Sequence, residues 1–161
     1  MPTVSVETSA GRDYSLAMRT EQDVEAYLLR LNRRYRSIDS QPGTFSVSTS
    51  GEMPEAIIRV EPPLVVVRVH IGNVLAESSR EALFRQLLEL NAQRLVHASY
   101  GLDGSTIVLS SALELENLDF NELEATLDEI DVALAEQVPD LARLARPAPN
   151  VVARQPPPGT L

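Results

Sequence analysis

The fold of this chain is decided between Leu83 and Leu134, where the sequence is LFRQLLELNAQRLVHASYGLDGSTIVLSSALELENLDFNELEATLDEIDVAL. Its first part spaces leucines and a phenylalanine three and four residues apart, which is the period of an amphipathic helix. Just before it, Ser78 and Glu81 have the spacing of a capping box, in which a hydroxyl and a carboxylate bond the first free amides. We therefore expect a helix that begins near Ser78.

A β-hairpin and another helix are expected in the rest of this stretch. Residues 97–100 and 105–112 have strand character, and residues 101–104 between them carry two glycines that suit a turn with positive φ. Asp119, three residues before Glu122, is predicted to cap the following helix. Its apolar stripe consists of Leu123, Leu127, Ile130 and Leu134.

The preceding part of the chain predicts one helix and three strands. Thr20 is expected to cap a helix that continues to about Ser37, because apolar residues recur there at helical spacing. Residues 44–49, 55–60 and 64–71 alternate as strands do, and Gly- and Pro-containing turns separate them. Short turns favour an antiparallel meander. The fold class is therefore α+β, with a five-stranded antiparallel sheet and three helices in the order α-βββ-α-ββ-α.

Both ends of the chain differ from this central domain. Residues 1–19 have little periodicity and are expected to form a flexible arm. Pro139 is expected to end the last helix, and residues 143–161 are rich in proline without an apolar pattern. Such a tail buries too little surface to offset its chain entropy, so we expect it to be disordered. The predicted domain spans residues 20–142.

Composition restricts the function. The 161 residues hold 14 basic and 23 acidic side chains and no cysteine, which excludes disulfides and thiolate sites. A net charge of -9 disfavours nucleic acid and anionic membranes as partners. His70 and His97 fall on different predicted strands, and no catalytic motif occurs, so we expect no enzyme activity, no metal and no cofactor. The N-terminus lacks a secretion signal, and we expect a cytoplasmic protein.

Two charged clusters have alternative interpretations. The end of the first predicted helix carries Arg30, Arg33, Arg34 and Arg36, which are either a solvated face or a site for an acidic partner. Between Glu114 and Asp140 there are ten acids and no cation. This run is either a solvated face of the last helix or a surface that recognises a basic partner.

Several short motifs resemble those of type III secretion chaperones of the CesT/Tir class, and of the related YbjN-like family of candidate sensory transduction regulators. The resemblance covers about residues 20–138. It is carried by LLELNA at 87–92, YGLDG at 100–104, IVLS at 107–110 and LENLD at 115–119, leading into Glu122 and Leu123. The resemblance implies a small acidic dimer without enzymatic activity that holds a partly extended segment of a client protein.

The leucine-rich helix has more apolar surface than one contact with a sheet needs, which indicates either a dimer seam or plain core burial. The residues that we expect at a homodimer seam are Leu83, Leu87, Leu90 and Arg94. For contact with a client or regulatory protein we expect Phe45, Val47, Leu64 and Val66. The alternative is a regulatory or signalling module that senses a small ligand in a pocket between sheet and helices, lined by Arg68, His70 or Tyr100.

Overall fold

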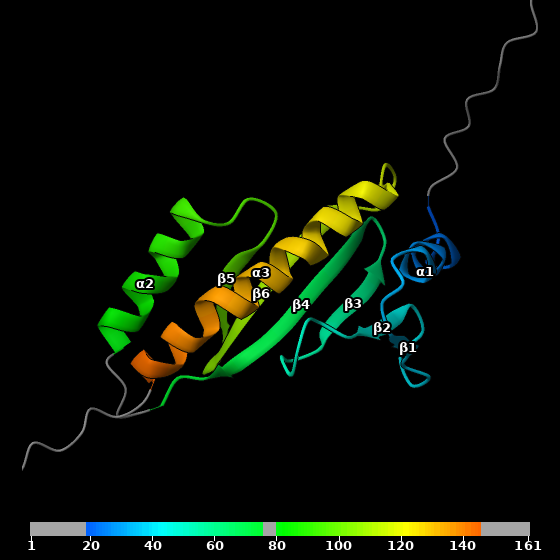
Figure 1. The fold of residues 1–161 in the computed structure, drawn as a ribbon. Helices are drawn as coiled ribbons and strands as arrows, with labels where there is room; N and C mark the ends of the chain where they lie inside the picture. Colours follow the sequence, from blue (N-terminus) through cyan, green and yellow to red (C-terminus); the bar gives the residue numbers. More distant parts are fainter. Residues whose placement is uncertain (1–18, 76–79, 146–161) are drawn as a thin grey trace, which may run out of the picture.

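A computed structural model describes residues 19–75 and 80–145 of the chain. Three helices and six strands follow one another in this part, and the strands form a single antiparallel sheet in the order β1-β2-β3-β4-β6-β5 (Figure 1). The elements are α1 (Glu21–Arg30), β1 (Tyr35–Ser37), β2 (Thr44–Val47), β3 (Ala56–Glu61), β4 (Leu64–Asn73), α2 (Arg80–Gln93), β5 (Ser99–Asp103), β6 (Thr106–Glu114) and α3 (Phe120–Ala145). The predicted α+β class is confirmed.

The sheet has six strands, not the five predicted, because the first helix is shorter than expected. It ends at Arg30, with Leu31 as its C-cap, and Asn32 follows at a positive φ of 52°. Asparagine tolerates this left-handed conformation, which turns the chain out of the helix. Tyr35 then pairs with Val47 on β2 and starts an edge strand instead of another helical turn.

The β5–β6 hairpin turns two residues later than predicted. Asp103 pairs with Thr106, so Gly104 and Ser105 alone form the loop. Gly104 has a positive φ of 60°, as a two-residue hairpin loop requires, whereas Gly101 lies inside β5 opposite Val108. The first glycine of YGLDG is therefore a strand residue.

The last helix does not end at Pro139 but continues to Ala145, so the first three residues of the predicted tail are helical. A proline within a helix removes one backbone hydrogen bond. Burial offsets this loss, because Leu141 is almost completely enclosed and Leu144 packs against the core beyond the proline. Residues 1–18 and 146–161, which make up most of the predicted arm and tail, lie outside the described residues.

Two of the three predicted helix caps are confirmed. The Thr20 hydroxyl accepts a hydrogen bond from the Asp23 amide, and the Asp23 carboxylate accepts one from the Thr20 amide. The hydrogen bonds that the Thr20 amide and the Thr20 hydroxyl donate to the Asp23 carboxylate lower the pKa of Asp23. The Asp119 carboxylate accepts a hydrogen bond from the Glu122 amide at 2.8 Å. Ser78 lies outside the described residues.

All three helices pack on the same face of the sheet. α3 lies over the part of the sheet formed by β5, β6 and β4, α2 lies beside α3 at the β5 end, and α1 lies toward the β1–β2 end (Figure 1). The inward side chains of β4, which are Val65, Val67 and Val69, are completely buried and join the helices in one apolar cluster. Within residues 19–75 and 80–145, no helix lies over the outward side chains of β4, which leaves an open sheet face.

Candidate protein-binding surfaces

The open sheet face has an apolar strip bordered by charges. Along β4 it presents Leu64, Val66, Arg68 and His70, and Leu64 is 37% exposed. Val66 pairs with Arg59 on β3 and with Ala112 on β6, while Arg68 pairs with Ile57 on β3. The alternation of β4 therefore places apolar and basic side chains side by side on one surface.

A groove of about 350 Å³ crosses this face. Its lining consists of Gln41, Ile57, Arg59, Glu61, Val66, Arg68, His70 and Asp103. Two ion pairs border it, one between Arg59 and Glu61 at 2.8 Å and one between Arg68 and Asp103 at 3.5 Å. All four side chains are well exposed, so these pairs hold their positions weakly and can rearrange around a ligand.

Of the four residues predicted to contact a partner, the structure places two on this face and two on the other. Leu64 and Val66 lie on the open face. Phe45 and Val47 lie on the inner face and are 1% and 0% exposed, so a partner cannot reach them in this conformation. Both pairs fit strand alternation, and only the position of the helices decides which side is covered.

The residues predicted at a dimer seam are also divided. Leu83, Leu87 and Leu90 are 0%, 5% and 9% exposed and lie in the core of the chain itself. Arg94 is exposed and donates a hydrogen bond to Glu136 on α3 at 3.1 Å. A partner that approaches α2 would therefore not contact these three leucines but the exposed side chains of the helix.

The side of α2 that faces away from the core carries a second apolar surface, which we name the α2 patch and define as Phe84, Leu88 and Ala92. Leu88 is 69% exposed, and Phe84 is half-buried. A hollow of about 480 Å³ lies over the patch, and its border is formed by Glu81, Arg85, Glu89 and Gln93. The sequence indicated a surplus of apolar surface, since both flanks of α2 are apolar. It did not indicate which flank the sheet would cover.

Much of the acidic run holds the fold together. Asp128 and Asp131 each accept a hydrogen bond from Arg33 at 2.6 Å. Glu129 accepts hydrogen bonds from the amides of three consecutive residues that link α2 to β5, Val96 at 2.7 Å, His97 at 2.8 Å and Ala98 at 2.8 Å. The basic cluster also contributes contacts within the fold. The guanidinium of Arg30 lies 3.9 Å above the centre of the Phe120 ring, as in a cation–π interaction.

The polar cavity expected under the small-ligand alternative is not formed by the residues named for it. Arg68 and His70 line the groove on the open face, whereas Tyr100 is buried on the inner face. Burial raises the pKa of Tyr100 to about 12, and its hydroxyl has no hydrogen-bond partner among the residues that the structure describes. A different pocket, of about 350 Å³, lies between sheet and α3 and is lined mainly by apolar side chains, among them Ile71, Ile107, Val138 and Leu141.

Within residues 19–75 and 80–145, no group of three or more potential metal-ligating side chains converges. In the same part of the chain, none of the helices combines the length and the apolar character that crossing a bilayer requires.

Comparison with known proteins gives one family and several solved structures. The CesT_Tir_1 family model matches residues 17–147. One chain of the heterodimeric ExoU-SpcU complex from the type III secretion system of Pseudomonas aeruginosa has a similar fold. The TM-score is 0.58 at 18% identity, over 72% of this chain and 95% of that chain. YbjN from E. coli, described as a candidate transcription regulator, has a TM-score of 0.56 at 11% identity, over 71% of this chain and 88% of that chain. None of the curated proteins matches the sequence.

Proposed function

This chain belongs to the CesT_Tir_1 family, and from this premise we propose that it is a non-enzymatic, chaperone-like homodimer of the cytoplasm that holds a segment of a partner protein. The observation that carries the proposal is the open sheet face, where Leu64 and Val66 lie beside a groove and no helix of the described part of the chain covers them. An extended segment of a partner fits such a surface, since its alternate side chains can enter the groove.

Two further features support a protein client. The ExoU-SpcU structure, which shares this fold, is a heterodimeric complex. The border of the groove carries both signs of charge, with Arg59 and Arg68 beside Glu61 and Asp103. A mixed border can pair with polar groups of a segment while the apolar strip holds its side chains.

We expect the substitution Val66→Asp to weaken client binding by about thirtyfold. It places a carboxylate in the middle of the apolar strip, and burying this charge under a client costs about 2 kcal/mol or more. The client is captured first by a photo-crosslinking residue at position 64, in the native host, and is identified by mass spectrometry. Its affinity for the purified variant is then compared with that for the unchanged protein.

The matched control uses Val132 on the exposed side of α3, which is 53% exposed and lies on the helical side of the sheet. A crosslinker at position 132 should not capture the same client, and Val132→Asp should leave its affinity unchanged. Equal capture from both positions would show that the client does not bind to the open face.

The α2 patch is the surface that we propose for the homodimer. A two-fold axis brings the same patch of both copies together, so the patch must complement itself. With two α2 helices antiparallel about a point near residue 87, Arg85 of each copy lies opposite Glu89 of the other. Arg85 is only weakly held in its own chain, by Glu81 at 3.7 Å, and is free to form that pair. The seam would then use Leu88 and Phe84 at the surface, with the predicted Leu83, Leu87 and Leu90 supporting them from below.

The pocket between sheet and α3 favours the second candidate function, a regulatory module that senses a small ligand. Its lining, with Ile71, Val138 and Leu141, suits an apolar metabolite. Under this alternative, an apolar metabolite that binds the pocket should raise the melting temperature of the protein in a thermal shift screen. A Val138→Trp substitution, which fills the pocket, should then remove the shift.

A further inference from the structure

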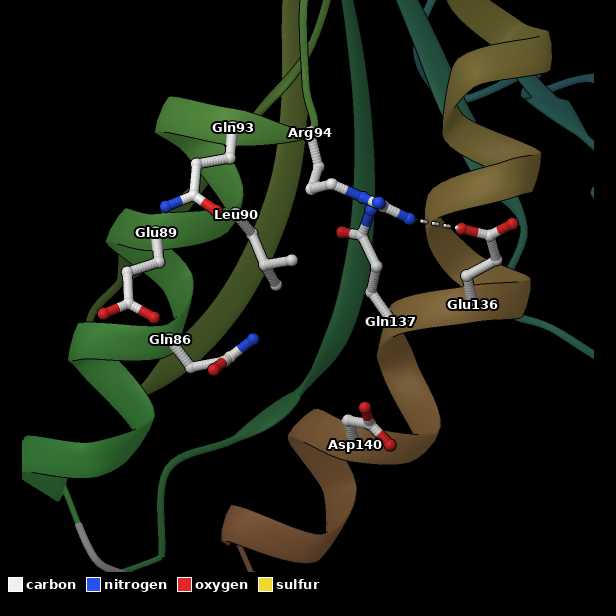
Figure 2. A pocket seen from close by; sticks show the side chains of 8 residues that line it. All are labelled: Gln86, Glu89, Leu90, Gln93, Arg94, Glu136, Gln137 and Asp140. Carbon is white, nitrogen blue, oxygen red and sulfur yellow. Dashed lines mark hydrogen bonds and ion pairs between the residues drawn. The ribbon is translucent and has the colours of Figure 1, made fainter.

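A groove between α2 and α3 has a different chemistry from the open sheet face. Its volume is about 350 Å³. Figure 2 shows the side chains that line it, with α2 on one side and α3 on the other. They are Gln86, Glu89, Leu90, Gln93, Arg94, Glu136, Gln137 and Asp140. Except for Leu90, the lining is polar, and most of its groups can accept hydrogen bonds.

The charges of this groove are unbalanced. Glu89, Glu136 and Asp140 contribute three carboxylates, against the single guanidinium of Arg94. Arg94 donates to Glu136, and Arg143, which lies outside the lining, pairs with Asp140. Glu89 has no ion-pair partner among residues 19–75 and 80–145. The groove therefore attracts a cation.

A buried glutamine is the second and independent sign of a ligand. Gln137 is 7% exposed, and its Oε1 atom has no hydrogen-bond donor within the described part of the chain. Its side chain projects from α3 into the space between the helices, toward Arg94 (Figure 2). A buried acceptor without a donor destabilises the folded state, and a leucine of similar size would avoid this cost. The glutamine is thus better explained by a donor that arrives from outside.

We propose that the α2–α3 groove binds a guanidinium group. A guanidinium has five N–H donors in a rigid plane, which can serve Gln137 Oε1 and the Glu136 and Asp140 carboxylates at once. It is also weakly hydrated, so one of its faces can lie on Leu90. Arg94 demonstrates the fit at one end of the groove, where its guanidinium donates to Glu136 at 3.1 Å. An incoming group displaces this exposed and weakly held side chain.

The site does not depend on the client surface, because it lies on the helical side of the sheet. A guanidinium can come from an arginine of a polypeptide or from a free small molecule. The test titrates the full-length, isotope-labelled protein with argininamide, and separately with a blocked peptide that has one arginine between glycines. The matched lysine compounds are titrated in parallel. NMR follows the side-chain amides of Gln86, Gln93 and Gln137 at physiological salt.

The expected result is a saturable shift of the Gln137 amide with the arginine compounds, and binding at least several times weaker with the lysine compounds. Tighter binding of the peptide identifies a polypeptide as the source, whereas equal binding identifies the guanidinium itself as sufficient. No shift at these amides with either arginine compound overturns the proposal. Equal affinity for lysine also overturns it, because the groove would then be a general cation-binding surface.

Two variants test the contacts. Gln137→Leu should weaken binding of argininamide by about tenfold, since it removes one hydrogen bond to a charged group, and should raise the melting temperature by about 3 °C. Glu136→Gln should also weaken binding, whereas Glu116→Gln, with the same charge change at an exposed turn, should not. The combination of higher stability and weaker binding is the signature of a ligand site. Unchanged binding by Gln137→Leu would contradict it.

Discussion

Glu129→Ala is expected to destabilise the folded chain by about 3 kcal/mol. The Glu129 carboxylate accepts hydrogen bonds from the amides of Val96, His97 and Ala98 at 2.7 to 2.8 Å. Hydrogen bonds to a charged acceptor are the strong ones, and their loss leaves three amides of one turn without a protein partner. Water can replace the carboxylate at the exposed amides but less well at Ala98, which is 8% exposed. Urea unfolding followed by circular dichroism measures the change.

Two other variants distinguish the loss of the amide contacts from the loss of a negative charge on the helix. The stability of Glu129→Gln should lie between those of the wild type and the alanine variant. The side-chain oxygen of the glutamine can still accept a hydrogen bond, but its NH₂ group cannot accept one from a backbone amide. Glu124→Ala, on the same helix, removes a carboxylate without a hydrogen-bond partner in the described residues, and should change the stability by less than about 1 kcal/mol. Equal effects of Glu124→Ala and Glu129→Ala would mean that the helix charge matters, not the amide contacts.

Leu88→Asp is expected to convert the proposed homodimer into a monomer at micromolar concentration. Leu88 is 69% exposed in the single chain, so the substitution costs the folded monomer little. In the dimer it would bury two carboxylates close to each other on the two-fold axis. This costs several kcal/mol, which is more than a hundredfold in the dissociation constant. Size-exclusion chromatography with light scattering measures the mass of both proteins.

Charge exchange tests the arrangement of the two copies. Arg85→Glu should weaken the dimer, because each new carboxylate would lie opposite Glu89 of the other copy. Adding Glu89→Arg should restore it, since the pair is then reversed but complementary. Leu29→Asp, on the exposed side of α1, is the matched control and should leave the mass unchanged, since Leu29 is 65% exposed and lies outside the α2 patch. A wild-type protein that is monomeric at these concentrations would refute the seam.

Helices and strands were largely predictable because local patterns determine them. The apolar period of residues 83–95 predicted α2, and the alternation of residues 64–71 predicted β4, with Val65, Val67 and Val69 on one side. Two caps followed from single residues, Thr20 and Asp119. Such signals extend over a few neighbours along the chain, so they survive without knowledge of the rest of the fold.

Predictions were less accurate where a distant segment competes with the local pattern. Tyr35 has helical spacing with the residues before it, but pairing with Val47 and the positive φ at Asn32 place it in β1. Pro139 should end a helix by its own chemistry, yet α3 continues to Ala145 because Leu141 and Leu144 pack on the core. In both places tertiary contacts outweigh a local preference of roughly 3 kcal/mol or less.

The sequence by itself determined the α+β class, the order of most elements and the chain's acidity, since each of these depends on composition or on short-range periodicity. Only the tertiary structure decided which surfaces are open. An apolar stripe is equally apolar whether the helices cover it or not. It is the packing of the three helices on one sheet face that buries Leu87 and Phe45 and leaves Leu88 and Leu64 for a partner. The same packing brings Gln137 beside α2, whose residues lie more than forty positions earlier in the chain. No local sequence pattern carries that information.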